Sequence, residues 1–164
     1  MISMHNHAPQ NYICPICLGI NGAESEQTLI RQSDVIYRDE IVMAFITSFF
    51  IGKNTGHVVI VPLQHFENLY DLPDAISAHL VQVSKRLAVA IKLAYGCEGI
   101  TILQNNEPAG GQHAFHYHMH LFPRYDGDAL HAHMLEKRVT TAEERRPFAE
   151  KLKNALSTHG LSFL

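Results

Sequence analysis

The sequence predicts an α+β fold with a mostly antiparallel sheet of five strands, one long helix and a short C-terminal helix. Three observations lead to this class. Short apolar runs bounded by turn residues predominate, one long segment has helical periodicity, and strands and helices do not alternate as in a doubly wound fold. With 164 residues, 46% of them hydrophobic and 18% charged, the chain matches a single globular domain.

Three strands are expected before the helix. Residues 35–38 and 42–47 are short runs rich in β-branched and aromatic side chains, and an acidic turn separates them. A glycine-containing cluster at 52–56 forms the next turn. Residues 57–61 then form a strand that is apolar enough to be buried on both faces.

The long helix is expected to begin at Pro73 and to end at Gly96. Proline suits the first turn of a helix, and glycine suits its C-terminal cap. Between them, apolar residues recur every three or four positions and form one stripe. The stripe consists of Ile76, Leu80, Val83, Leu87, Ile91 and Ala94.

Two further strands flank a polar loop after this helix. Residues 99–104 form the first strand, and residues 105–111 form a glycine-rich loop. The second strand covers residues 114–122 and stops at Pro123.

The final short helix is expected to open at Pro147. Thr141 and Glu144 match a capping box, but Pro147 would interrupt a helix begun there. We therefore divide the chain into three parts. They are a flexible N-terminus (1–12), a folded domain (13–125) and a C-terminal tail with a short helix (126–164) that packs on the same domain.

Composition argues against several classes of function. Thirteen basic and sixteen acidic residues give a net charge of −3, so the chain lacks the electrostatic footprint of a nucleic-acid-binding protein. No stretch approaches the roughly 18 apolar residues of a membrane span, and the N-terminus lacks the apolar region of a signal peptide. We therefore expect a cytoplasmic protein that binds neither nucleic acid nor membrane.

Histidine is the unusual residue in this composition. The chain has twelve, and His116, His118 and His120 occupy alternate positions in the predicted strand at 114–122. Because side chains alternate between the faces of a strand, these three share one face and the apolar residues between them share the other. The apolar face packs into the core, and imidazoles without partners are costly to bury. The histidine side is therefore expected to line a cleft.

The loop before the histidines indicates phosphate chemistry. Gly110 and Gly111 offer backbone N–H groups, and Asn105, Asn106 and Gln112 offer side-chain amides. Such a collar of donors suits phosphate oxygens. A neutral imidazole beside it is a nucleophile for phosphorus, because it can form a phosphoramidate that water then hydrolyses. The residues therefore predict hydrolysis or transfer at a phosphate.

These motifs resemble those of the histidine triad (HIT) superfamily of nucleotide hydrolases and transferases. The run H-Y-H-M-H-L-F carries the resemblance, together with N-N-E-P-A-G-G-Q before it, P-R-Y after it and G-H-V-V-I-V-P upstream. The resemblance implies a two-layer fold and a homodimer that shares one sheet. It also implies a purine nucleotide substrate that contains AMP, either a phosphoramidate or a dinucleoside polyphosphate.

The resemblance further implies a role for each site residue. His118 would attack the α-phosphorus to give a nucleotidyl-histidine intermediate, with His120 on the same phosphate and His116 in support. The other implied residues are Gln112 on the leaving-group side, Asn105 at the ribose or phosphate, His57 orienting the triad, and Ile16, Ile20, Phe45 and Ile46 around the base and leaving group.

Two positions depart from the family pattern. His113 stands where many members carry a small hydroxyl residue, so hydroxyl-assisted departure of the leaving group is in doubt. Thr47 stands where an acidic residue commonly binds the ribose. It is either a weaker ribose contact or only a strand residue.

Cys14 and Cys17 form a C-x-x-C motif, which is either half of a tetrahedral zinc site or a reduced thiol pair at a turn. The chain resembles the bacterial HIT branch, in which this motif, a P-x-x-H histidine and the first triad histidine hold a structural zinc. The resemblance therefore implies Cys14, Cys17, His65 and His116 as ligands. Such a closed set would brace the N-terminal segment and would not activate water.

Two other functions remain open. One is a metal-dependent hydrolase in which His116 and His118 form an H-x-H metal pair. The other is a nucleotide-binding regulatory module with little turnover, which the absence of an acidic residue at Thr47 favours. No organic cofactor is expected in any of these cases.

Overall fold

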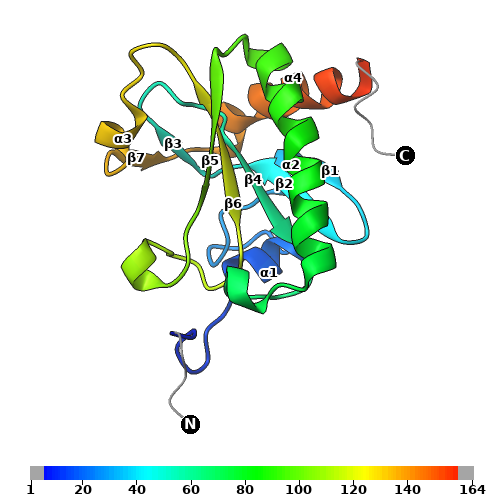
Figure 1. Ribbon diagram of the computed structural model, residues 1–164, viewed down its shortest axis with the longest axis vertical. Helices are drawn as coiled ribbons and strands as arrows, with labels where there is room; N and C mark the ends of the chain where they lie inside the picture. Colours follow the sequence, from blue (N-terminus) through cyan, green and yellow to red (C-terminus); the bar gives the residue numbers. More distant parts are fainter. Residues whose placement is uncertain (1–5, 159–164) are drawn as a thin grey trace.

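The computed structural model describes residues 6–158 and confirms the α+β class (Figure 1). Its main sheet has five strands, and every neighbouring pair is antiparallel. The parts of the predicted flexible N-terminus and C-terminal tail at 1–5 and 159–164 lie outside the described residues. Across the sheet, the strands are β1 (Val35–Arg38), β2 (Val42–Ile46), β4 (Val58–Pro62), β6 (Met119–Arg124) and β5 (Gly99–Gln104).

The sequence does not predict a second sheet, which pairs β3 (Phe49–Ile51) with β7 (Lys137–Val139). Each of these strands has only three residues, too few to show a period of two. All three residues of β7 are exposed, so this strand has no apolar signature either. We refer to the pair as the β3–β7 ribbon.

The prediction for residues 114–122 is wrong at both ends. The strand β6 begins only at Met119, because Tyr117 N–H donates to the carbonyl of Phe66 (2.6 Å), in the loop after β4. At its other end β6 continues through Pro123. Proline is tolerated there because β4 has stopped pairing with β6, so the missing N–H interrupts no second ladder.

The long helix α2 (Asp74–Tyr95) is present as predicted, and Gly96 caps it with a φ of 64°. The C-terminal helix α4 (Ala142–Thr158) is longer than the predicted one, because it starts at the capping box. Glu144 N–H donates to Thr141 Oγ1 (3.3 Å), and Thr141 N–H donates to Glu144 Oε2 (2.8 Å). Pro147 lies inside the helix, near its N-terminal end.

The remaining helical segments are short. They are α1 (Pro15–Ile20), α3 (Leu130–His133) and the 3₁₀ turns Gln32–Asp34, Leu69–Asp71 and Pro108–Gly110. The helix α1 begins at the C-x-x-C motif, where Cys14 Sγ accepts a hydrogen bond from Cys17 N–H (3.4 Å). Within residues 6–158, no helix is both long and apolar enough to cross a membrane.

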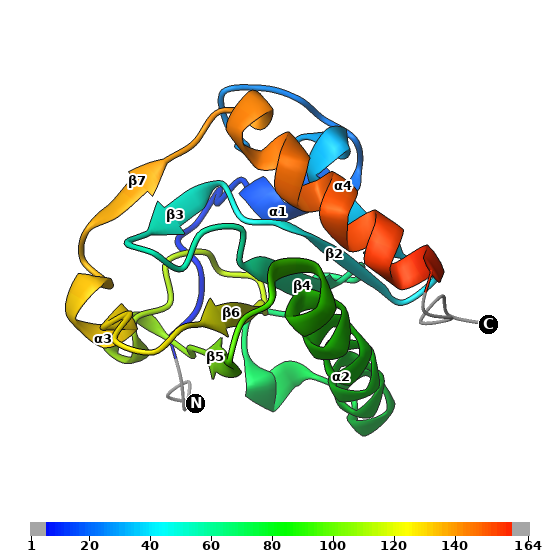
Figure 2. The same ribbon diagram turned by 90° about the horizontal axis from the view of Figure 1, so that it is seen from above.

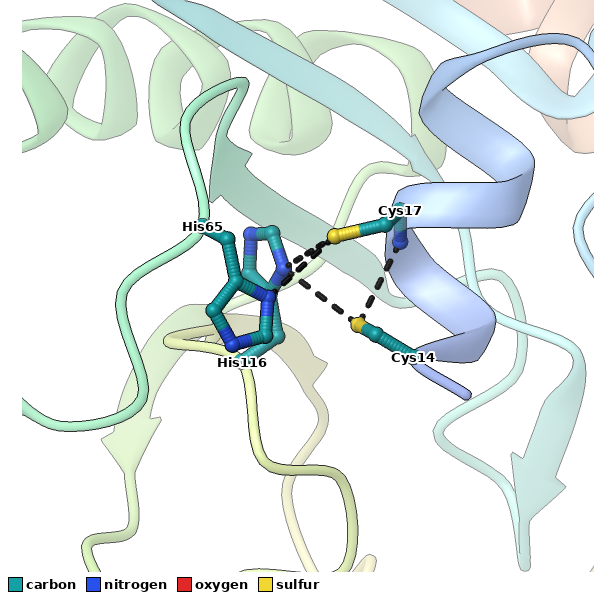
Figure 3. Close-up of side chains that lie close together, drawn as sticks. All are labelled: Cys14, Cys17, His65 and His116. Atoms are coloured by element: carbon teal, nitrogen blue, oxygen red, sulfur yellow. Dashed lines mark hydrogen bonds between the residues drawn. The ribbon is translucent and has the colours of Figure 1, made fainter. Parts of the chain in front are cut away.

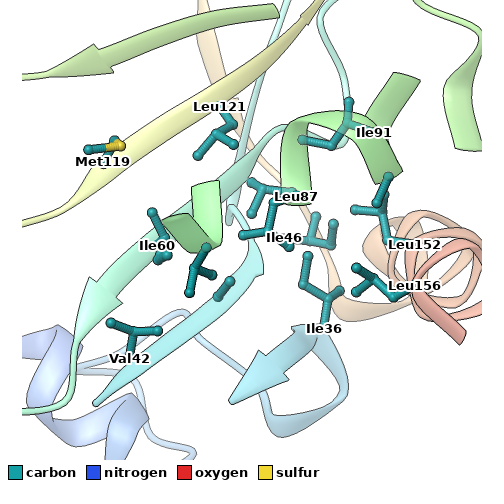
Figure 4. Close-up of a cluster of buried hydrophobic side chains, with 14 of the residues drawn as sticks. Ile36, Val42, Ile46, Ile60, Leu87, Ile91, Met119, Leu121, Leu152 and Leu156 are labelled. Atoms are coloured by element: carbon teal, nitrogen blue, oxygen red, sulfur yellow. The ribbon is translucent and has the colours of Figure 1, made fainter. Parts of the chain in front are cut away.

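One face of the main sheet, here called the helix-covered face, packs against α2 and α4 (Figures 1 and 2). The predicted α2 stripe lies in this core, which alternate residues of β2 and β4 complete from the sheet (Figure 4). Its sheet residues include Val42, Ala44, Ile46, Val58, Ile60, Met119 and Leu121. The prediction that residues 57–61 are buried on both faces is confirmed, since every residue of β4 is buried.

The opposite face, here called the histidine face, is covered in two separate places. At one end, α1 packs Ile16 and Ile20 against Phe45 and Val59. At the other end, Ile51 of the β3–β7 ribbon and Leu130 of α3 pack against Phe122. His120 pairs with Val59 across the ladder and lies two residues before Phe122. The residues next to His118 and His120 in the chain are buried, and the histidine side chains lie between the two apolar clusters.

A buried ion pair fastens α4 to the segment before β1. Arg145 donates from Nε to Asp34 Oδ1 (2.9 Å), and its second nitrogen lies 2.8 Å from Oδ2. The guanidinium also donates to the carbonyls of Leu29 (3.1 Å) and Thr140. Both side chains are almost fully buried, so the fork of Arg145 satisfies a carboxylate that water does not reach.

Candidate functional site

The histidines share one face although most of their segment is not a strand. Tyr117, Met119 and Leu121 point into the core of the helix-covered face. His116 is fully buried on the other side, and His118 and His120 are partly exposed there. Phe115 departs from the predicted apolar row, since its ring packs edge-on against Tyr12 (5.5 Å between centroids) instead of entering the core.

Cys14, Cys17, His65 and His116 form a compact cluster (Figure 3). One ligand atom from each lies within 4.8 Å of the other three. Cys17 Sγ is 3.2 Å from His65 Nδ1 and 3.4 Å from His116 Nδ1, and Cys14 Sγ is 3.5 Å from His116 Nδ1. In a tetrahedral zinc site the sulfur and nitrogen ligands lie about 3.5 Å apart, given Zn–S and Zn–N bonds of about 2.3 and 2.0 Å. The donor set therefore fits zinc.

The second nitrogen of His116 supports this geometry. His116 Nε2 lies 3.0 Å from the carbonyl oxygen of Pro62, to which it donates. The hydrogen bond leaves the lone pair on Nδ1, the atom that faces the thiols, and metal-binding histidines typically have such a second partner. Burial lowers the pKa of His116 to about 4. Burial and the neighbouring Cys14 raise the pKa of Cys17 to about 12, so the Cys17 thiol ionises at neutral pH only with a cation beside it.

A hydrogen bond fixes which nitrogen of His118 carries the lone pair. Its Nδ1 lies 2.7 Å from the carbonyl oxygen of His116 and donates to it, so Nε2 carries the lone pair. Burial lowers the pKa of His118, with a smaller contribution from His113, while the hydrogen bond to the His116 carbonyl opposes the shift. The ring is therefore neutral at pH 7, as a nucleophile requires.

His120 and His57 form an aromatic stack beside it. The His120 ring is 5.1 Å from the His118 ring, 5.4 Å from the His57 ring and 5.6 Å from the Phe122 ring. Burial, followed by the charges of nearby basic groups, lowers the pKa of His120 to about 3, and burial also lowers the pKa of His57. Within the described chain, Nδ1 of each ring is buried without a hydrogen-bond partner. This orphaned pair is consistent with a polar ligand.

The loop before the histidines does not form the predicted collar. The backbone N–H groups of Gly110, Gly111 and Gln112 all donate to carbonyls within the loop. Gln112 is buried, and its amide donates to the carbonyl of Glu67 (2.6 Å) and accepts from Glu107 N–H (2.7 Å). Because both ends of this amide are occupied by backbone, the geometry gives no support to a contact between Gln112 and the leaving group. Gln112 instead holds the loop against the segment after β4.

The two asparagines of the loop differ in their contacts. Asn106 is committed to structure, since its Oδ1 accepts from Leu69 N–H (2.7 Å) and from Gln104 (3.1 Å). Asn105 makes only a long contact, from Nδ2 to the carbonyl of Gly111 (3.4 Å), and is partly exposed. Asn105 therefore remains the loop amide that can turn to a ligand.

Comparison with known proteins identifies the fold and the motif together. A model of the HIT domain matches residues 29–127. The chain belongs to the HIT family. It is 35% identical to "Protein hit" of Bacillus subtilis (strain 168) over 124 residues, which are 75% of this chain and 80% of that protein. A solved Hit-like protein from Bartonella henselae superposes with a TM-score of 0.74 at 27% identity and covers 91% of this chain and 100% of its own.

The match to a relative with a named activity covers a shorter part of the chain. The adenosine 5′-monophosphoramidase HNT1 of Saccharomyces cerevisiae is 38% identical over 71 residues. The match spans 43% of this chain and 42% of that protein. HIT relatives thus include nucleotide hydrolases, and several others similar to this chain are uncharacterized HIT-like proteins.

Within this HIT fold, the predicted residues around the base separate into two groups. Ile16 and Ile20 of α1 pack together with Phe45 on the histidine face. The prediction for Ile46 is wrong, because Ile46 is fully buried in the helix-covered core. Phe45 and Ile46 are neighbours on β2, and adjacent strand residues point to opposite faces, so only one of them can approach the site.

Thr47 has a local task. Its hydroxyl accepts a hydrogen bond from Phe49 N–H (3.3 Å), its own N–H donates to the carbonyl of His57 (3.1 Å), and the residue is buried. These contacts support the interpretation of Thr47 as a structural residue that turns the chain from β2 into β3.

Lys137 is a candidate that the sequence does not reveal. It lies on β7, and its charge contributes to the low pKa of His120. A lone lysine in an exposed tract carries no motif, and the pairing of β7 with β3 depends on the tertiary structure. No sequence signal could have indicated its electrostatic effect on His120.

Proposed function

We propose that this HIT protein hydrolyses nucleotides, cleaving AMP from a phosphoramidate or a dinucleoside polyphosphate through a covalent intermediate on His118. One observation carries the proposal. The His118 ring is neutral and is held through Nδ1 on the carbonyl of His116, which presents the lone pair of Nε2 beside His120. A prearranged neutral imidazole is what nucleophilic attack on phosphorus requires.

The reaction balances in two steps. His118 Nε2 bonds to the α-phosphorus while the bond from phosphorus to the leaving nitrogen or oxygen breaks. The leaving group takes the electron pair, and an amine leaving group also takes up a proton from solvent. Water then attacks the same phosphorus, the P–N bond to His118 breaks, the water oxygen becomes part of AMP, and a proton of the water is released to solvent. His120, adjacent and neutral, is placed to donate a hydrogen bond to the phosphate oxygens, and His57 supports the His120 ring.

We propose a structural zinc ion at Cys14, Cys17, His65 and His116. Zinc bound there would tie α1 and the loop after β4 to the segment that presents His118. The alternative H-x-H metal pair is disfavoured, since His116 Nδ1 faces the thiols and its Nε2 is bound to Pro62. His116 therefore has no nitrogen to share with His118 on a second ion. The reduced thiols also favour the cytoplasm as location.

We propose a homodimer joined through β5. This strand is an edge of the main sheet, and Ile102 on it is 52% exposed. An uncovered apolar edge strand is a template for pairing with another chain. A second copy would extend the sheet across both subunits.

The mass of the intact protein tests the covalent mechanism. After brief exposure to an adenylated substrate, the wild type should gain the mass of one AMP, and His118→Ala should gain none and lose turnover. His79→Ala is a matched control, because His79 lies on α2, behind the helix-covered face, and bonds to Asp39 (2.7 Å).

If His118→Ala retained turnover, the nucleophile would be another group. If the wild type bound AMP tightly but neither formed the adduct nor released AMP from any tested substrate, the chain would be a nucleotide-binding regulatory module.

A further inference from the structure

Lys137 lies on the side of the β3–β7 ribbon that faces the site. It is directly opposite Ile51 in the ladder, and opposed residues of an antiparallel pair share a face. Ile51 is buried against Phe122 of β6. The stem of Lys137 crosses the ring of Phe49, with Nζ 5.3 Å from its centroid. Lys137 therefore lies on the ribbon face that packs on Phe122, with its ammonium group over Phe49.

The contacts of Phe122 connect this ribbon to the catalytic rings. Phe122 stacks on His57 (4.1 Å between centroids) and on His120 (5.6 Å). Lys137 is also within electrostatic reach of His120, since its positive charge helps to lower the pKa of that ring. Packing and electrostatics therefore agree on the position of the ammonium group.

The charge of Lys137 is not neutralised within residues 6–158. Its neighbour Arg138 points to the other face of the ribbon, where it bonds to Glu144 (2.8 Å) and lies over Phe50. Lys137 has no ion-pair partner among the described side chains. Glu136, the preceding residue, bonds instead to His133 (2.8 Å).

Two carboxylates near the loop are also occupied. Glu67 accepts from Ala8 N–H (3.2 Å), and Glu107 accepts from Asn6 N–H (2.8 Å). In the described chain, the charged or titratable groups that shift the pKa of His120 are basic ones, namely His118, Lys137 and His113. The site therefore combines neutral imidazoles with an uncompensated cation, which suits an anionic ligand.

We propose that Lys137 binds the leaving group of the substrate and gives this protein a preference for nucleotides whose leaving group is an anionic phosphate chain. The inference rests on the proposed function and names its substrate class: dinucleoside polyphosphates rather than phosphoramidates. When the P–O bond of a phosphoanhydride breaks, its electron pair stays on the departing oxygen. An ammonium group stabilises that growing negative charge. An amine leaving group takes up a proton as it departs and gains nothing from Lys137.

Kinetics with two substrates test this assignment. Lys137→Met keeps the apolar stem over Phe49 and removes only the charge. We expect it to lower kcat/KM for diadenosine tetraphosphate about tenfold and to change kcat/KM for adenosine 5′-phosphoramidate less than about twofold. Lys137→Arg should retain most of the preference. Lys151 is exposed on α4, which packs on the helix-covered face. Lys151→Met removes the same charge and should leave both kcat/KM values unchanged.

Equal losses for the two substrates would overturn the proposal, because they would indicate a structural role for Lys137. Unchanged values in Lys137→Met would overturn it as well. Increasing salt should shrink the effect of Lys137→Met, since screening weakens a partly exposed charge contact.

A binding measurement separates this inference from the proposed function. In the His118→Ala background, calorimetry with diadenosine tetraphosphate and with AMP reports affinity without turnover. Lys137→Met should weaken binding of the tetraphosphate about tenfold and leave AMP affinity unchanged. This result would support Lys137 as the phosphate-chain contact even if the wild type released no AMP. Equal tetraphosphate affinities with and without Lys137 would refute the assignment even if His118 proved to be the nucleophile.

Discussion

The two faces of the main sheet are stabilised in different ways. The helix-covered face has one continuous apolar core, in which α2 and α4 pack on alternate residues of the strands. The histidine face has two small apolar clusters, and the residues between them are imidazoles, two of which have an orphaned buried nitrogen. One face therefore supplies stability through packing, whereas the other keeps polar groups ready for a ligand and depends on specific contacts to hold its short elements.

This contrast explains why the site can be built on a segment of irregular backbone. The segment that carries His116 and His118 is anchored from behind by Tyr117, which enters the helix-covered core. It is anchored in front by the hydrogen bonds of His116 to Pro62 and of His118 to His116. A rigid packed face behind the site allows the histidine face to expose groups that would be costly to bury.

The largest expected effect on stability comes from substitution of Arg145, which bonds α4 on the helix-covered face to the segment before β1. Arg145→Ala leaves the buried Asp34 carboxylate without its partner, so we expect the free energy of unfolding to fall by about 3–5 kcal/mol. Urea unfolding followed by circular dichroism measures the loss. Arg146→Ala, an exposed neighbour, is the control and should change stability by less than about 0.5 kcal/mol. A small loss for Arg145→Ala would mean that the buried ion pair contributes little to stability.

Removing the metal should loosen one face only. Cys17→Ser should lower zinc content well below one ion per chain and the free energy of unfolding by about 3 kcal/mol, since a ligand that binds only the folded state stabilises it. Hydrogen exchange should rise in α1 and around His118 more than in α2. In contrast, Leu87→Ala in the helix-covered core should cost about 2–5 kcal/mol without changing zinc content. If wild-type protein contained no zinc, the thiols would be a reduced pair.

The smallest expected effect is on the pH dependence of the free energy of unfolding. The pKa of His120 is about 3 in the folded protein, below its ordinary value of 6.5, because burial favours the neutral ring. The unfolded chain therefore binds more protons between these values, and stability is fully present above pH 6.5 and declines as the pH falls toward 3. We expect this residue to contribute about 1 kcal/mol per pH unit between pH 6 and 5. In His120→Phe the pH slope of the unfolding free energy should become shallower by that amount. An unchanged slope would show that His120 is not buried as a neutral ring.

The fold could be predicted largely because its signals are local. The α2 stripe, the strands 35–38 and 99–104, and the apolar run of β4 each show their period within a short window. The start of the C-terminal helix has no clear local signal, because the capping box predicts a start at Thr141 and Pro147 predicts a later one. The packing of α4 decides in favour of the earlier start. The β3–β7 ribbon has no local signal, and its pairing depends on residues 86 to 90 positions apart.

The candidate site divides in the same way. The alternation of His116, His118 and His120 and the C-x-x-C motif are visible in the sequence, and the structure brings the four predicted zinc ligands together. The loop was predicted as a phosphate collar, but most of the donors expected for it are engaged within the protein. Whether an N–H or amide is available to a ligand depends on its internal hydrogen bonds, and Gln112 uses both ends of its amide on distant backbone groups.

By itself, the sequence determined the class of the fold, the apolar face of the histidine segment and the residue types of the site, because covalent spacing alone sets periodicity and motif. Only the tertiary structure decided which nitrogens of His116 and His118 are engaged, that Ile46 faces away from the site, and that Lys137 shares a ribbon face with Ile51. These facts depend on contacts between segments distant in the chain. Burial and hydrogen-bond partners, which set tautomers and pKa values, do not exist until those segments pack.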